Sequence, residues 1–332
     1  MKHYLGVDGG GTKTDFLLID ERGRILARQR EGSAYYLETG VDALKAMFAK
    51  GIRATLQQSG ITAGDVTFAV LGVPAYGEDT RLLPVLDSLA APLLPPERCR
   101  SVNDVVCGWA GALAGRDGIS MVAGTGSVAY GECLGRTARG GGWGELFSDE
   151  GSAYWIAREG LQLFSRMSDE RVPKSVLYSK LRAHFQLQGD LDLCAAVYGP
   201  PALSRSQIAA LAPIVAEAAL EGDESARALF TTAAEELADI VHAVRAQLNV
   251  PKTARLPVSY SGGMFRFTAL LLEPFRDELT RSGHAYDFTP PTLSPCAGAA
   301  LYAAKLAGTP LDSPAIQELT QHLAAVSAEG EA

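Results

Sequence analysis

The sequence predicts an α/β fold made of two similar halves, and three observations support this prediction. Residues 3–19 form two short apolar runs joined by a glycine turn, which is typical of a hairpin. Residues 119–134 repeat this plan of strand, glycine turn and strand, so the fold looks internally duplicated. In the first half, further apolar runs alternate with helical patterns, as in a sheet with helical crossovers. The chain of 332 residues is long enough for two domains.

The first half should form a sheet whose first part is antiparallel, because three strands precede the first crossover. We predict strands at 3–7, 15–19, 24–30, 67–73 and 99–103, and helices at 41–58, 79–91 and 105–113. Pro84 lies inside the second of these helices and favours a break there.

The second half is richer in helical patterns, with apolar residues three and four positions apart. We predict strands at 119–123, 128–134, 256–260 and 285–288, and helices at 153–167, 174–186, 206–221, 224–248, 265–281, 295–307 and 313–326.

Composition excludes several classes of protein. Hydrophobic residues make up 47% of the chain and charged residues 20%, which is typical of a soluble globular protein. A formal charge of −8 argues against a nucleic-acid partner. The five cysteines form no C-x-x-C pair, and no apolar run approaches 18 residues. We therefore expect a cytoplasmic protein with no membrane segment and no secretion signal.

The first glycine turn carries the strongest chemical signal. Three consecutive glycines, Gly9 to Gly11, allow backbone N–H groups to approach an anion closely, and Thr12 and Lys13 add a hydroxyl and a cation. The carboxylate of Asp8 is negatively charged, as phosphate is, so it does not suit a direct contact with phosphate but does suit a bound Mg²⁺. The spacing is neither that of a Walker A loop nor that of a dinucleotide fingerprint. The alternative is a glycine hairpin at a sheet edge that binds no ligand.

Several blocks carry a family resemblance. They are Asp8–Thr14, Val102–Asp104, Ala123–Ser127, Gly141–Gly144, Ser148–Trp155 and Ser261–Gly263. In this order they resemble the actin-like, sugar-kinase and Hsp70-type ATPase superfamily, and more narrowly the N-acetylglucosamine kinases with the related activating ATPases of hydroxyacyl-CoA dehydratases. The G-G-W-G and D-E-G-S-A-Y-W blocks are the most specific.

The resemblance implies a duplicated actin-like ATPase (ribonuclease H-like) fold, with two domains around a cleft. The first domain would span residues 1–115 and be joined by the last helix, at about 312–326. The second would span residues 116–308 and contain a helical insertion. A homodimer is the expected assembly.

The resemblance also assigns roles to residues. Two loops would hold the phosphates of ATP, and Gly262 and Gly263 would hold its adenosine end. Asp8 would hold Mg²⁺ through water, Asp104 would be the catalytic base, and further residues would line the amino-sugar pocket. The loop residues are Gly10, Gly11, Thr12 and Lys13 in the first loop and Gly124, Thr125 and Gly126 in the second; the pocket residues are Tyr35, Asp104, Ser127, Gly142, Trp143, Gly144 and Asp149.

Asp104 also stands out without the resemblance, because it directly follows a strand of a predicted α/β sheet. Ligands bind beyond the carboxyl ends of such strands, and one carboxylate suffices to orient and deprotonate an attacking hydroxyl. The alternative is that Asp104 caps the following helix, a role that Asn103 can fill equally well.

The segment around Trp143 and Asp149 has similar alternatives. Asp149 and Glu150 precede a helix and suit its positive end, but neighbours there point in different directions. We assign Asp149 to sugar hydroxyls and Glu150 to structure. Trp143 lies between glycines with no apolar periodicity around it, and an indole face suits a sugar ring.

The expected function is phosphorylation of the 6-hydroxyl of N-acetylglucosamine, with ATP and Mg²⁺. One departure from the family concerns Tyr35, which stands where N-acetylglucosamine kinases usually carry Asn. Glucosamine and glucose are therefore alternative substrates. An activating ATPase with an iron–sulfur cluster, served by Cys107 or Cys133, and a sugar sensor with a degenerate site are the alternatives from other classes.

Overall fold

The computed structural model describes residues 1–329, with side chains described as far as residue 325. The chain forms two compact units. Unit 1 consists of Met1–Asp117 and the chain from Pro290 onward, and unit 2 consists of Gly118–Thr289. Unit 2 is thus an insertion in the chain of unit 1.

Unit 1 is built on a five-stranded mixed sheet of order β3-β2-β1-β4-β5. The first three strands are antiparallel, as predicted, and β4 and β5 are parallel to β1. Their bounds are β1 His3–Gly9, β2 Thr14–Asp20, β3 Ile25–Glu31, β4 Phe68–Val73 and β5 Cys99–Asn103.

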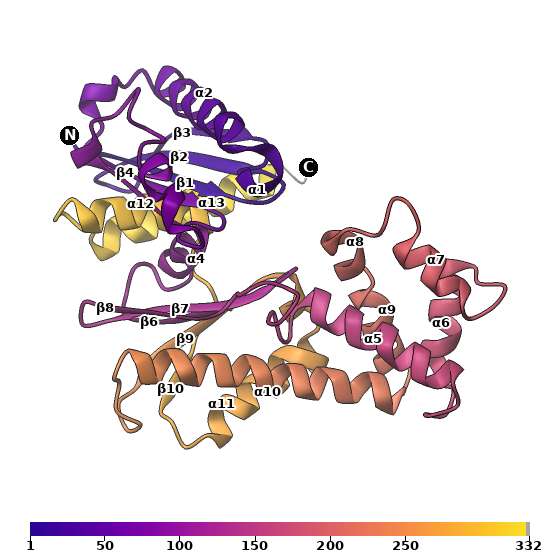
Figure 1. Cartoon of the computed structure of the whole chain (residues 1–332). Helices are drawn as coiled ribbons and strands as arrows, with labels where there is room; N and C mark the ends of the chain where they lie inside the picture. Colours follow the sequence, from indigo (N-terminus) through magenta and orange to yellow (C-terminus); the bar gives the residue numbers. More distant parts are fainter. Residues whose placement is uncertain (330–332) are drawn as a thin grey trace. The chain divides into compact units, whose positions relative to one another are not determined.

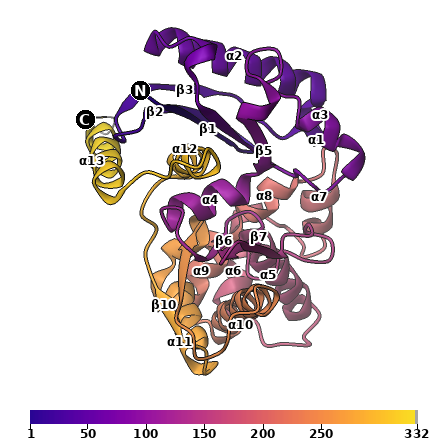
Figure 2. The ribbon, with the colours of Figure 1, turned by 90° about the vertical axis from the view of Figure 1, so that its left-hand side faces the viewer.

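Helices cover both faces of this sheet (Figures 1 and 2). The strands are apolar on both faces because successive side chains point in opposite directions. Phe16 of β2 packs toward α2 (Val41–Ser59), whereas Leu17 belongs to the core formed with α12 (Pro295–Leu306). The remaining helices of unit 1 are α1 Tyr36–Thr39, α3 Leu83–Leu86, α4 Asp104–Ala112 and α13 Ser313–Glu329.

Unit 2 repeats the topology of unit 1. Its sheet has the order β10-β9-β6-β7-β8, again with three antiparallel strands followed by two parallel ones. The bounds are β6 Gly118–Ala123, β7 Ser127–Cys133, β8 Arg136–Gly141, β9 Leu256–Ser261 and β10 Tyr286–Phe288. The predicted duplication is confirmed, although β8 was missed because its glycine-rich sequence lacks an apolar alternation.

The helices of unit 2 lie mostly between β8 and β9. They are α5 Ala153–Ser168, α6 Val176–Phe185, α7 Asp192–Tyr198, α8 Arg205–Ala209, α9 Ala212–Leu220 and α10 Glu224–Gln247, and α11 Glu273–Arg281 follows β9. The long helix α10 runs along the sheet and packs on β6, β7 and β8 (Figure 1). None of the helices within residues 1–329 combines the length and apolarity needed to cross a membrane.

Three predicted helices are divided near a proline. The stretch 79–91 forms only a 3-10 turn and α3, the stretch 206–221 is divided into α8 and α9, and in the stretch 265–281 the π-helix Thr268–Leu272 leads directly into α11. Pro84, Pro213 and Pro274 each occupy one of the first two positions of an α-helical segment, where a missing N–H costs nothing. Each proline therefore lies at the start of an α-helical segment.

Helix α12 belongs to unit 1, contrary to the predicted domain boundary at 308. Its backbone packs directly on β1 and α4 through glycines. A Cβ added at Gly6 would lie 2.3 Å from the backbone N of Ala300, and one at Gly298 would lie 2.1 Å from the backbone N of Gly111. The alanine-rich sequence of α12 allows this close approach, which periodicity alone does not reveal.

Candidate functional site

The first glycine turn joins β1 to β2 in unit 1. The N–H of Gly10 donates to the carbonyl of Lys13 at 2.9 Å, and the carbonyl of Gly10 accepts the N–H of Ala34. The turn leaves Gly11, Thr12 and Lys13 exposed. The Lys13 Nζ lies 3.9 Å from a carboxylate oxygen of Asp15, so its charge stays close to the turn.

Asp8 and Asp104 are brought close to each other at the carboxyl ends of the parallel strands. Asp8 pairs in register with Gly72 of β4, and a Cβ at Gly72 would lie 3.5 Å from the Cα of Asp104. Burial raises the pKa of Asp8 to about 8, and the negative charge of Asp104 contributes in the same direction. Two carboxylates in this relation favour a cation between or beside them.

Asn103 caps helix α4, and Asp104 is the first residue of that helix. The Asn103 side-chain oxygen accepts the N–H of Val105 at 3.2 Å, and its amide nitrogen donates to the carbonyl of Tyr76. The capping alternative for Asp104 is therefore wrong. The carboxylate of Asp104 is not needed to begin the helix and lies near its positive end.

The second glycine turn joins β6 to β7 in unit 2, and the beginning of α5 holds it. The N–H groups of Ala153 and Tyr154 donate to the carbonyls of Gly124 and Thr125, at 2.9 and 3.3 Å. Ser152 caps α5 by accepting the N–H of Trp155 at 3.2 Å. The start of α5, which belongs to the D-E-G-S-A-Y-W block, is thus hydrogen-bonded to the G-T-G-S turn, and the two form one structure.

Ser127 and Asp149 meet in unit 2, but both face inward. The Ser127 N–H donates to Asp149 Oδ1 at 3.3 Å, and its hydroxyl donates to the carbonyl of Glu150 at 2.6 Å. Asp149 is 2% exposed, and Arg205 Nη2 donates to its Oδ2 at 2.5 Å. Burial raises the pKa of Asp149, while Arg205 and the Ser127 N–H act in the opposite direction. In this conformation the polar atoms of both residues are used within the protein.

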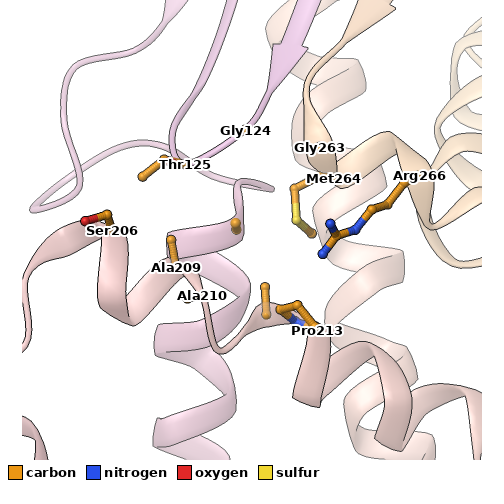
Figure 3. Close-up of a pocket in the computed structure, with 11 residues that line it drawn as sticks. Gly124, Thr125, Ser206, Ala209, Ala210, Pro213, Gly263, Met264 and Arg266 are labelled. Atoms are coloured by element: carbon orange, nitrogen blue, oxygen red, sulfur yellow. The ribbon is translucent and has the colours of Figure 1, made fainter. Parts of the chain in front are cut away.

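A cavity of about 360 Å³ opens between the second glycine turn, the Gly262–Gly263 turn and helices α8 and α9 (Figure 3). Its residues are Gly124, Thr125, Ala153, Ser206, Ala209, Ala210, Ala212, Pro213, Gly263, Met264 and Arg266. Three of the residues predicted to bind ATP, Gly124, Thr125 and Gly263, are brought together here. Gly262 instead packs on β6, since a Cβ there would lie 2.3 Å from the carbonyl oxygen of Ala123.

Arg266 is the cationic residue of this cavity, and sequence reasoning missed it. Figure 3 shows its side chain directed across the cavity from the Gly263 side. Its guanidinium lies 4.8 Å from the centre of the Phe267 ring. The opposite wall, with Ser206, Ala209 and Ala210, was also missed, because α8 is distant in sequence from both glycine turns. The capping box of Ser204 and Gln207 was the signal that could have located α8.

The predicted sugar segment of unit 2 presents apolar side chains to solvent. Trp143 is 75% exposed, and Leu146 and Phe147 in the same loop are also exposed. Gly142 and Gly144 have positive φ values of 68° and 100°, which place Trp143 at the tip of a turn.

Tyr35 lies in unit 1 next to the first glycine turn. It follows Ala34, whose N–H donates to Gly10, and its ring packs at the edge of the core beneath α2. Its own N–H donates to Ser33 Oγ at 3.1 Å.

Comparison with known proteins agrees with these features. Residues 5–303 match the family model described as the BadF/BadG/BcrA/BcrD ATPase family. The chain is 29% identical over 313 residues to an N-acetyl-D-glucosamine kinase of Dictyostelium discoideum, a match that covers 90% of this chain and 97% of that protein. It is 27% identical over 277 residues to an N-acetylmuramic acid/N-acetylglucosamine kinase of Clostridium acetobutylicum, covering 83% and 90%.

Solved structures give the same fold. A proposed N-acetylglucosamine kinase from Chromobacterium violaceum superimposes with a TM-score of 0.71 at 26% identity, covering 91% of this chain and 99% of that one. A ROK family glucokinase from Streptomyces griseus superimposes with a TM-score of 0.51 at 20% identity, covering 92% and 98%, and supports the fold alone. The predicted two-domain, duplicated α/β fold of actin-like sugar kinases is confirmed.

Proposed function

The chain belongs to the BadF/BadG/BcrA/BcrD ATPase family, and from this we propose that it is an ATP-dependent kinase for the 6-hydroxyl of N-acetylglucosamine. The two kinase relatives, each matched over most of its length, support the substrate class. The observation that carries the proposal is the position of Asp104. Its carboxylate follows the parallel strand β5, lies close to Asp8, and is released from capping by Asn103.

Asp104 acts as the general base of the reaction. Its carboxylate accepts the proton of the sugar 6-hydroxyl while the hydroxyl oxygen forms a bond to the γ-phosphorus of ATP. The bond between that phosphorus and the β–γ bridging oxygen breaks, and ADP leaves. Because phosphoryl transfer needs mostly orientation and charge neutralisation, one carboxylate and a few positive groups suffice.

Asp8 fits a bound Mg²⁺. Its half-buried carboxylate has a raised pKa, so a cation there relieves an existing electrostatic cost. Mg²⁺ needs few protein ligands, because it keeps several waters and takes one or two carboxylates together with substrate phosphates. When bound, Mg²⁺ supplies charge neutralisation on the phosphates.

Each unit, taken by itself, carries groups that suit ATP. In unit 1 the exposed residues Gly11, Thr12 and Lys13 offer N–H, hydroxyl and ammonium donors for phosphate oxygens. In unit 2 the cavity of Figure 3 receives the adenosine end of ATP, with Gly124 and Thr125 toward the phosphates and Arg266 over the nucleoside. The small alanine side chains of α8 and α9 leave room for a flat base.

The test is ADP release with MgATP and a panel of N-acetylglucosamine, glucosamine, glucose, N-acetylmannosamine and no sugar. We expect turnover that requires N-acetylglucosamine. Turnover only with glucosamine or glucose would keep the mechanism and change the substrate, with Tyr35 as the first residue to vary. Hydrolysis that is independent of sugar would instead support an activating ATPase, which absorbance near 400 nm from an iron–sulfur cluster would identify.

We further propose a cytoplasmic homodimer. Light scattering coupled to gel filtration tests the assembly, because a dimer doubles the mass of a single chain.

A further inference from the structure

We propose that Arg205 is a positioning residue that couples the nucleotide cavity to the segment of residues 142–149. The substrate assignments of that cavity and segment rest on the proposed function. Arg205 belongs to none of the motifs that identify the family resemblance, and it is the first residue of the short helix α8. All the contacts that carry the inference lie within unit 2.

Arg205 makes two ion pairs with the segment. Its Nη2 donates to Asp149 Oδ2 at 2.5 Å, and its Nε lies 3.3 Å from Glu145 Oε2. Glu145 directly follows Gly144, and Glu145 and Asp149 lie on either side of the exposed residues Leu146 and Phe147. One guanidinium therefore contacts both ends of the stretch 145–149, with a hydrogen bond to Asp149 and a partly exposed ion pair to Glu145.

The same guanidinium lies against the second glycine turn. A Cβ added at Gly126 would lie 2.5 Å from Arg205 Nη2 and 2.8 Å from Asp149 Oδ1. Asp149 Oδ1 in turn accepts the N–H of Ser127, the last residue of that turn. A shift of the turn toward the Arg205–Asp149 pair would displace the pair, because the space beside Gly126 is filled by it.

The backbone of Arg205 is continuous with the wall of the nucleotide cavity. Ser206, the next residue, and Ala209 and Ala210 in the following turn line that cavity (Figure 3). Helix α8 is held at its start by the capping box of Ser204 and Gln207, so it moves as one body. A nucleoside that presses on α8 thus displaces Arg205, and through it Glu145 and Asp149.

Asp149 needs this partner. Its backbone has a φ of +63°, a left-handed conformation that is unfavourable for a residue other than glycine. Its carboxylate is buried, and an unpaired buried carboxylate is unfavourable. Arg205 supplies the charged partner of this carboxylate, and the Ser127 N–H supplies a neutral one, so removing Arg205 leaves the buried charge with the Ser127 N–H and weakens the hold on the segment.

The experiment measures the environment of Trp143 without any sugar. Acrylamide quenching of tryptophan fluorescence is recorded with and without a non-hydrolysable ATP analogue, and the signal of a Trp143→Phe variant is subtracted. Because the indole of Trp143 is 75% exposed, a change in its accessibility is measurable. The comparison is made for the unchanged protein and for Arg205→Ala, Arg205→Lys and Glu145→Gln.

We expect the analogue to change Trp143 quenching in the unchanged protein, to have no such effect in Arg205→Ala, and to have a reduced effect in Arg205→Lys and Glu145→Gln. Arg158→Ala is the matched control. It removes an arginine of the same unit that pairs with its neighbour Glu159, at 2.7 Å, and it should leave the response unchanged.

Several results would overturn the inference. One is an unchanged protein whose Trp143 does not respond to saturating analogue, and another is an Arg205→Ala variant that responds fully. A variant that folds normally but loses more than tenfold in affinity for the analogue would make Arg205 a direct nucleotide ligand. Far-UV circular dichroism verifies folding, and Glu145→Gln, which keeps the Asp149 pair, provides the result if Arg205→Ala does not fold.

A second readout extends the test to the sugar. The analogue should lower the dissociation constant for N-acetylglucosamine, by a factor within the usual range of roughly 5 to 150 for coupled sites. Arg205→Ala should bring this factor close to one. Failure of the proposed function, seen as no turnover with any sugar of the panel, leaves the fluorescence test intact, so the two failures are distinguishable.

Discussion

Asn103 caps the helix that begins at Asp104. Of these two adjacent polar residues, Asn103 stabilises the helix and Asp104 is the proposed catalytic base. The Asn103 side chain accepts the N–H of Val105 at 3.2 Å and ties the strand end to Tyr76. Asp104 does not cap the helix. Burial raises the pKa of Asp8, and the negative charge of Asp104 adds to this effect.

Replacing the two residues separately should separate activity from stability. Asp104→Asn should lower kcat by roughly 100-fold to 10,000-fold, the usual contribution of a general base, with little change in Tm. Asn103→Ala should cost about 0.5 to 2 kcal/mol of stability through the lost cap and retain most of kcat per folded molecule. Steady-state kinetics and urea unfolding measure both. A kcat for Asp104→Asn within threefold of the unchanged protein would remove Asp104 from the mechanism.

Asp8→Asn should stabilise the fold at alkaline pH while abolishing activity. The pKa of Asp8 is raised in the folded protein to about 8, so the folded state binds a proton that the unfolded state releases at much lower pH. The stability that this proton gives is complete below the pKa of the unfolded chain and is lost as pH rises toward 8. The amide side chain of the Asp8→Asn variant does not ionise, so the variant does not lose this stability as pH rises.

The measurement is urea unfolding without Mg²⁺ at pH 4.5 and at pH 8.5. The gain of Asp8→Asn over the unchanged protein should be larger at pH 8.5, by on the order of 1–3 kcal/mol. An equal difference at the two pH values would contradict the raised pKa.

Gly298→Ala should destabilise unit 1 by at least about 1–3 kcal/mol, because the new methyl group meets the backbone of α4 and cannot be accommodated by a rotamer change. Gly108→Ala in α4 is the matched control, since its Cβ would have no atom within 4 Å. It should be neutral or stabilising by up to about 1 kcal/mol through helix propensity. Chemical denaturation of both variants measures this difference in the free energy of unfolding. Equal midpoints would show that the α4–α12 contact is looser than the structure has it.

His242 should make unit 2 less stable in acid. Its Nδ1 lies 2.8 Å from the Tyr286 hydroxyl, and its ring stacks on His284. Burial, followed by the charge of His284, lowers the pKa of His242. The folded state therefore favours neutral His242, and the associated stability is present above about pH 6.5 and lost as pH falls through the lowered pKa.

The pH dependence of unfolding between pH 7.5 and 5 tests this effect. His242→Gln should flatten the curve in this range, where one proton contributes a slope of at most about 1.4 kcal/mol per pH unit. His322→Gln is a suitable control, because His322 lies on α13 of unit 1 and pairs with Glu318 near the surface. A curve for His242→Gln that coincides with that of the unchanged protein would assign the acid sensitivity elsewhere.

Local sequence was sufficient to predict the strands other than β8, the two glycine turns and the family. The apolar runs on either side of Gly9–Gly11 and Gly124–Gly126 predict hairpins because turn chemistry and strand propensity agree there. The same local agreement predicts the capping role of Asn103 as one of two options, and only the hydrogen bond to Val105 decides between them.

Partners distant in sequence could not be predicted. The pairing of Arg205 with Asp149 joins positions separated by 56 residues, and Arg266 enters the nucleotide cavity from yet another segment. The assignment of Asp149 to sugar hydroxyls remains a prediction, and its carboxylate is used internally in this conformation. The membership of α12 in unit 1 depends on backbone contacts at Gly6 and Gly298, which no pattern of apolar residues records.

The return of the chain through α12 affects the order of events during biosynthesis. Residues 118–289 are continuous, so unit 2 can fold once they have left the ribosome. The sheet of unit 1 is synthesised first, but one of its faces stays uncovered until α12 has been made, and the N–H groups of Thr292 and Leu293 then bind the carbonyls of Ala112 and Gly111. Until then Tyr4, Leu17 and their neighbours are exposed apolar surface, so the nascent first half is open to aggregation while unit 2 is being made.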